Sequence, residues 1–66
     1  MNTTLTGRFE EVDQARVARK DMIAAGIPQE KIYIDEDRQQ IKVIIPEEES
    51  PQIREAFRNH DITEVQ

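Results

Sequence analysis

The chain has 66 residues and no cysteine. A chain of this length buries only about 60% of the surface that its unfolded form exposes, and such chains often need disulfides, a metal or association with another chain. Disulfides and Cys- or His-rich metal sites are excluded, because cysteine is absent and there is one histidine. We therefore expect a single domain over residues 1–66, without a cofactor, whose most available support is self-association.

The charge balance argues against two classes of partner. The 14 acidic residues outnumber the 9 basic ones, and the net charge is −5. Nucleic acids and anionic membranes attract mainly basic side chains, so neither is an expected partner. No apolar run approaches the roughly 18 residues of a membrane span. The first residues, MNTTLTGRF, lack the pattern of a signal peptide. We expect a cytoplasmic protein.

The N-terminal part of the chain predicts a strand and a helix. Apolar and polar residues alternate over Thr3–Phe9, as in a strand with one buried face. Gly7 within this strand indicates either a bulge or the close approach of a helix. The helix follows, with a start within Glu10–Asp13, where Asp13 is the best capping residue.

The end of this first helix is clearer than its start. Gly26 suits the left-handed position that follows a helix, Ile27 can fold back on the last turn, and Pro28 prevents continuation. We therefore end the helix at Ala25. The residues that share one face at helical spacing are Val12, Ala15, Ala18, Arg19, Met22, Ile23 and Gly26.

A β-hairpin forms the middle of the chain. The runs Ile32–Ile34 and Ile41–Ile45 are rich in β-branched residues, and the polar Asp35–Gln40 separates them. The polar segment begins like a calcium-binding loop. That loop needs glycine at its sixth position, where Gln40 stands, and glutamate at its twelfth, where Pro46 stands. We interpret the segment as a solvated hairpin tip.

A second helix and a last strand complete the chain. Ser50 is expected to cap a helix that runs from Pro51 to about Asn59. Its apolar side contains Ile53, Ala56, Phe57 and His60, and Ile62–Val65 forms the final strand. The order β-α-β-β-α-β predicts an α+β, ferredoxin-like fold. We expect a four-stranded antiparallel sheet in the order 4-1-3-2, with both helices on one face.

No group of residues predicts catalysis. The lone His60 has only Asp61 as a carboxylate near it in sequence, and Ser50, the one serine, is explained as a cap. Glu47–Glu49 could bind a hard cation, but consecutive carboxylates do not converge without further ligands. We interpret them as acids that stabilise the start of a helix, and we expect no enzyme activity.

Two features indicate binding. Arg19 lies within the apolar face of the first helix, either as an arginine that extends its head group to solvent or as a fork for a carboxylate or another anion. The second feature is the side of the sheet opposite the helices. Its expected residues are Arg8, Tyr33, Lys42, Ile44 and Val65. This side is either a solvated surface or a face for a dimer or partner. RNA-binding sheets of this topology carry aromatic residues on strands one and three, but the third strand here has none.

The segments LTGRFEEVDQARVARKDMIAAG and IPQEKIYI, at residues 5–34, resemble small bacterial general-stress proteins of the heat-induced type. VIIPEEESPQIREAFRNHDITEV, at residues 43–65, is similar to those versions that continue with a strand, an acidic loop, a helix and a His-Gly turn. Arg19 replaces an expected aliphatic residue, and Asp61 replaces the glycine of the turn. The resemblance implies a bacterial cytoplasmic origin and provides no catalytic residues.

These observations together predict a non-catalytic interaction module, related to stress by the resemblance. We expect a homodimer, or a complex with a protein partner, formed through the open side of the sheet or through a sheet edge. The alternative is a regulatory domain in which Arg19 and the loops bind a small anionic metabolite.

Overall fold

The computed structural model of the protein describes residues 1–65, and position 66 of the predicted domain lies outside the described residues. The elements are, in chain order, β1 (Asn2–Arg8), α1 (Val12–Ala24), β2 (Ile32–Asp35), β3 (Gln40–Pro46), α2 (Ser50–Asn59) and β4 (Thr63–Val65). Short 3-10 helices at Gln29–Lys31 and Glu47–Glu49 lead into β2 and α2. The predicted element order is confirmed, and each strand end lies within one residue of its predicted position.

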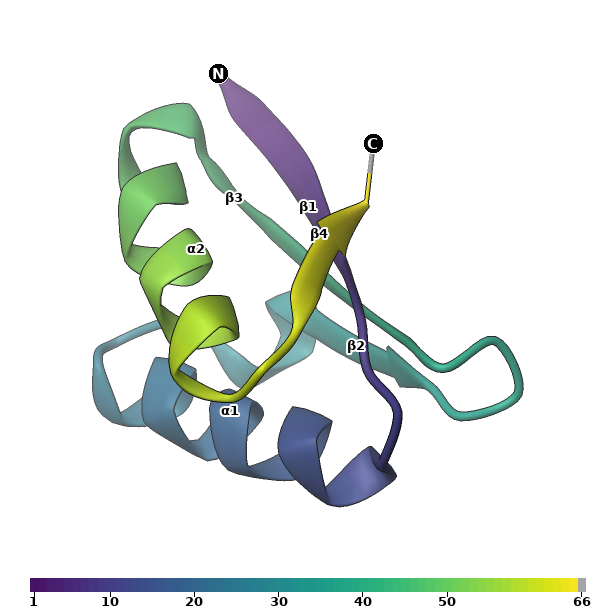
Figure 1. Ribbon diagram of the computed structural model, residues 1–66. Helices are drawn as coiled ribbons and strands as arrows, with labels where there is room; N and C mark the ends of the chain where they lie inside the picture. Colours follow the sequence, from purple (N-terminus) through teal and green to yellow (C-terminus); the bar gives the residue numbers. More distant parts are fainter. Residues whose placement is uncertain (66) are drawn as a thin grey trace.

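The four strands form one antiparallel sheet in the order β2-β3-β1-β4. This is the predicted order 4-1-3-2 read from the other edge. Both helices cover the same face of the sheet, while β1 and β3 lie at its centre and β2 and β4 at its edges (Figure 1). The predicted α+β arrangement is therefore confirmed.

The core lies between the sheet and the two helices. Alternate residues of β3 point toward the helices, and Val43 pairs with Leu5 of β1 on one side and with Ile32 of β2 on the other. Fully burying one such aliphatic side chain contributes roughly 1.5–3 kcal/mol. The buried apolar residues are Leu5, Phe9, Ala15, Ala18, Met22, Ile27, Ile32, Ile41, Val43, Ile45, Ile53, Phe57 and Ile62.

Gly7 marks the closest contact between β1 and the layer above it. Its register with β3 and β4 is regular, so it forms no bulge. A Cβ atom at this position would overlap Ile62 Cγ2 and would lie 3.0 Å from Phe57 Cε2. Of the two predicted explanations, the close approach of a helix is therefore the correct one.

The helix α1 ends in a Schellman motif, as the sequence predicts. Gly26 has φ +104° and donates a hydrogen bond from its N–H to the Ile23 carbonyl at 3.0 Å. The N–H of Ile27 donates to the Met22 carbonyl at 3.0 Å. Because the Ile27 side chain is buried, this turn anchors the chain at the core before β2 begins.

The helix α2 ends in the same way, with Asp61 in place of glycine. Asp61 has φ +56°, and its N–H donates to the Arg58 carbonyl at 3.3 Å. The N–H of Ile62 donates to the Phe57 carbonyl at 2.8 Å, and the Ile62 side chain is buried. The two halves of the chain therefore share one device for turning from a helix into a strand.

The helix α1 begins at Val12, within the predicted range Glu10–Asp13, but the capping residues of both helices differ from the prediction. Ser50 is no N-cap, because the 3-10 turn before it has already brought the backbone into helical geometry; Ser50 is the first helical residue, with φ −54° and ψ −43°. The N-cap of α1 is Glu11 rather than Asp13, which lies in the first helical turn. Ile23, predicted to share the apolar face of this helix, is 37% exposed, so the buried face of α1 is narrower than predicted.

Candidate interaction face

The residues predicted to form an interaction surface lie on the side of the sheet that faces away from the helices, which we call the open face. Thr6 pairs with both Lys42 and Val65, and Lys42 pairs with Tyr33. Paired residues of neighbouring strands point to the same side of a sheet. These four residues therefore form one continuous row across all four strands, and their sequence neighbours in the core point to the helices.

Arg8 and Ile44 occupy the rows on either side. Arg8 pairs with Gln40 of β3, nearer the hairpin tip, and Ile44 pairs with Thr4 of β1. The strand β2 begins too late to reach Ile44, so its only cross-strand neighbour comes from β1. The structure thus places all five predicted residues on the open face.

The open face is uncovered and partly apolar. Tyr33 is 55% exposed, and Ile44 and Val65 are half-buried by their neighbours alone. Both helices lie on the other side of the sheet (Figure 1). Tyr33 and Ile44 are diagonal neighbours on β2 and β3, whereas Val65 lies across the sheet on β4, so the apolar surface of this otherwise threonine-rich face is concentrated at Tyr33 and Ile44.

The open face is also nearly neutral in an acidic protein. The segments that connect the strands and α-helices carry 9 of the 14 acidic residues and only 2 of the 9 basic ones. The charged residues of the open face are Arg8, Lys42 and Asp35. The Asp35 carboxylate accepts a hydrogen bond from the Arg38 N–H at 3.2 Å and is thus already engaged in the hairpin turn. A like-charged copy is therefore repelled less at this face than at the loops.

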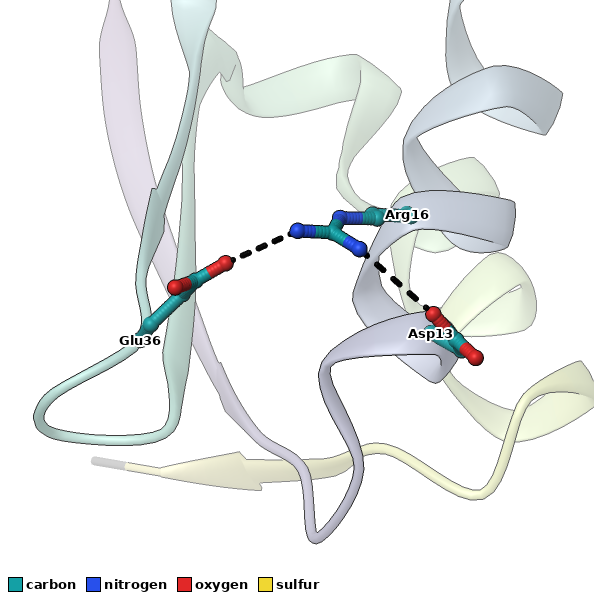
Figure 2. Close-up of polar contacts among 3 residues, drawn as sticks. All are labelled: Asp13, Arg16 and Glu36. Carbon is teal, nitrogen blue, oxygen red and sulfur yellow. Dashed lines mark hydrogen bonds and ion pairs between the residues drawn. The ribbon is translucent and has the colours of Figure 1, made fainter.

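Arg19 lies apart from the open face, in a groove on the helix side. It is half-buried on α1, between Arg16 and Lys20. Arg19 and Lys20 form no ion pair or hydrogen bond through their side chains within residues 1–65. Arg16 bridges the groove to the hairpin: one of its nitrogens lies 3.0 Å from Glu36 Oε1 and another lies 3.6 Å from Asp13 Oδ1 (Figure 2).

The groove was not predicted. Arg16, Arg19 and Lys20 have the i, i+3, i+4 spacing that aligns side chains on one helix surface, and this was the available signal. Its other wall comes from Ile34 and Glu36, which follow α1 by a turn and a 3-10 helix. Helical spacing alone contains no information about which edge strand lies opposite.

A histidine–carboxylate pair joins the two helices. His60 Nε2 lies 2.5 Å from Asp21 Oδ2 of α1, so the partner of His60 is not Asp61, its neighbour in sequence. Such a pair orients an imidazole, but nucleophilic catalysis also needs a hydroxyl or thiol within reach. The hollow beside His60 is lined by Asp13, Gln14, Val17 and Asn59 as well, and none of these residues has a hydroxyl or thiol group. The geometry assigns this pair to the packing of α1 against α2.

Gln14 connects the start of α1 with the end of α2. Its Oε1 accepts hydrogen bonds from the N–H groups of Glu10 and Glu11, at 3.0 and 2.8 Å. Its Nε2 donates to the carbonyl of His60 at 3.0 Å. Its acceptor role is that of a capping box, with Gln14 at the third helical position after the N-cap Glu11. No local sequence pattern indicates its second role, the hydrogen bond to the carbonyl of His60.

Another ion pair holds the last strand. Arg54 Nε of α2 lies 2.8 Å from Glu64 Oε1 of β4. The hydrogen bond to Glu64, followed by the charge of that carboxylate, raises the pKa of Arg54 above its ordinary value. The pair faces the helices and leaves the outer side of β4 to Val65. Within residues 1–65, no three His, Asp or Glu side chains are grouped as ligands for a metal ion.

Comparison of the chain with models of protein families, with curated proteins and with solved structures gives no match. The resemblance to general-stress proteins therefore stays a prediction. Neither α-helix of the described residues has both the length and the apolar character that crossing a bilayer requires.

Proposed function

We propose that this protein is a non-catalytic interaction module that self-associates through its open face. The observation that carries this proposal is the uncovered row of Tyr33, Lys42, Thr6 and Val65, with Ile44 beside it. The core lies on the other side of the sheet, so the fold does not require the apolar side chains of Tyr33, Ile44 and Val65 on this side.

The charge distribution favours a second copy at this face over a second copy at a sheet edge. Pairing two β2 edges would bring together the cationic groups of both α1 helices, which flank that edge. The other edge strand, β4, has only three residues and therefore offers few backbone hydrogen bonds. The open face avoids both problems, since its charges nearly cancel.

The size of the face sets the expected affinity. A standard protein–protein interface buries roughly 800 Å² on each partner, whereas the whole chain exposes 4542 Å². Four strands at about 4.8 Å spacing give a face only ~19 Å wide across the strands. Along the strand direction, the face is limited by its short edge strands, β2 and β4. We therefore expect a weak dimer, with a dissociation constant in the micromolar range.

Sedimentation equilibrium tests the proposal with one disruptive variant and one matched control. Ile44→Glu places a charge on the open face beside Tyr33 and should yield a monomer at concentrations where the unaltered protein is dimeric. Val17→Glu makes the same kind of change at an exposed site of α1 (45% exposed) and should leave the dimer intact. An unaltered chain that stays monomeric at high micromolar concentration contradicts the proposal, as does an equal effect of both variants.

A further inference from the structure

The groove between α1 and the outer edge of β2 forms a second surface, on the helix side of the sheet, which meets the open face only along the edge of β2. Its volume is about 460 Å³. Its walls combine three cations of α1 with two apolar side chains and one carboxylate: Arg16, Arg19, Lys20, Val17, Ile34 and Glu36. At the hairpin end, Arg16 reaches from α1 to Glu36, and its guanidinium lies 3.0 Å from the Glu36 carboxylate (Figure 2).

The groove has an excess of positive charge. Glu36 balances Arg16 alone, which it contacts at 3.0 Å. Arg19 and Lys20 have no acidic partner within residues 1–65, although the chain as a whole carries a charge of −5. Val17 and Ile34 beside them offer an apolar surface to the stem of an incoming side chain. The charge of the groove is therefore complementary to an acidic ligand.

The edge of β2 supplies a second kind of binding group. This strand pairs with β3 on one side, and no strand of the described residues lies on its other side. The backbone groups of such an edge strand are a template for one more strand. Extended peptides bind other sheets in this way, with backbone hydrogen bonds for affinity and alternate side chains for specificity.

We propose that the α1–β2 groove binds an extended segment of a partner protein, added as a fifth strand beside β2. Successive residues of a strand point to opposite sides of the sheet. Residues on one side of the added strand would enter the groove and should be acidic, to meet Arg16, Arg19 and Lys20. Those on the other side would lie beside Tyr33, on the outer surface of β2, and should be apolar. The partner segment is therefore one in which acidic and apolar residues alternate.

A small anionic metabolite would use this groove less completely. It could contact Arg19 and Lys20, but it would leave the unpaired edge of β2 without a role. The combination of cations with a parallel row of free backbone groups favours an extended chain over a compact anion.

Fluorescence anisotropy tests the proposal, with a labelled peptide of alternating glutamate and valine that is long enough to span the four residues of β2. Lys20→Glu should weaken binding by roughly tenfold or more, because it replaces an attraction with a repulsion. Arg58→Glu is the matched control, since it changes the net charge equally at an exposed site of α2 and should have little effect. Glu36→Gln should strengthen binding, because it removes the one carboxylate from the groove wall and leaves Arg16 paired only with Asp13, at 3.6 Å.

A second peptide separates strand addition from simple charge attraction. Methylation of alternate backbone nitrogens on the edge that meets β2 removes hydrogen-bond donors but no charge. It should abolish binding if a strand is added. Equal affinity of the methylated and unmodified peptides contradicts the proposal, and so does equal weakening by Lys20→Glu and Arg58→Glu. If free glutamate or inorganic phosphate binds as tightly as the peptide, the groove is a site for small anions and the proposal is wrong.

Discussion

Of the two glycines, Gly7 is the one without room for a side chain. Its alanine variant would place a methyl group against Ile62 and the Phe57 ring, both fixed in the core. Overpacking of this kind typically costs about 1–3 kcal/mol. We expect Gly7→Ala to lower the free energy of unfolding by that amount in urea denaturation.

Thr6→Ala is the control for this variant, because Thr6 lies next in sequence but on the open face. We expect it to change the free energy of unfolding by no more than about 0.5 kcal/mol. If the two variants unfold at the same urea concentration, the close packing of β1 against α2 is wrong.

Asp61 and Gly26 occupy equivalent left-handed positions after the two helices. Asp61→Gly and Gly26→Asp should therefore change the free energy of unfolding in opposite directions. The left-handed conformation costs a residue with a side chain roughly 1–2 kcal/mol, and the greater freedom of glycine in the unfolded chain offsets about 0.4–1 kcal/mol of this. Asp61→Gly should therefore stabilise the protein by a few tenths of a kcal/mol up to about 1 kcal/mol. Gly26→Asp should destabilise it, although a Cβ atom at this position would meet no other atom within 4 Å.

Thermal unfolding followed by circular dichroism measures both exchanges. A loss of stability in both variants would show that the Asp61 side chain contributes more than its backbone strain costs.

At the level of elements, Gln14 is the residue whose loss should disturb two helices at once. Gln14→Ala leaves the N–H groups of Glu10 and Glu11 without their acceptor, and loss of such a cap costs about 0.5–2 kcal/mol. It also removes the donor to the His60 carbonyl. We expect a decrease in the free energy of unfolding at the upper end of that range.

Gln14→Glu separates the two roles of this side chain. Glutamate keeps the acceptor for the two N–H groups and adds a favourable charge at the helix start, but it cannot donate to His60. Its stability should lie between those of Gln14→Ala and the unaltered protein in urea denaturation. A loss as large as that of alanine would assign the effect to the contact with His60 alone.

These elements also show what the sequence can predict. The hairpin, the open face and the end of α1 depend on local patterns: alternation along Ile41–Ile45, and the Gly26 and Pro28 signals after a helix. All three are confirmed in position. Alternation fixes the side to which each residue points, so the five residues of the open face follow from it directly.

The remaining features depend on contacts between segments far apart in the chain. Asp21 meets His60, and Gln14 meets the same turn, across 39 and 46 residues of sequence. The groove joins α1 to the edge of β2. The prediction that Ser50 is an N-cap was wrong for a local reason. The three glutamates before it already form a helical turn, and the N-cap is therefore Glu49.

At the scale of the whole molecule, charge and apolar surface are separated. The acidic residues concentrate in the connections, while the open face is nearly neutral and the α1–β2 groove is cationic. Two copies that each carry −5 repel one another at long range. This repulsion is screened beyond about 8 Å at 0.15 M ionic strength, so association through the open face should be measured at that ionic strength or above.

The most direct test of the central claim is a heteronuclear NMR spectrum of the unaltered protein at two concentrations. If the open face joins two copies, the amide signals of Arg8, Tyr33, Lys42, Ile44 and Val65 should shift with concentration, and relaxation should indicate slower tumbling at the higher one. The amide signals of exposed residues of α2, such as Arg58, should not shift with concentration. Identical spectra at both concentrations, or shifts confined to the helices, would contradict self-association through the open face.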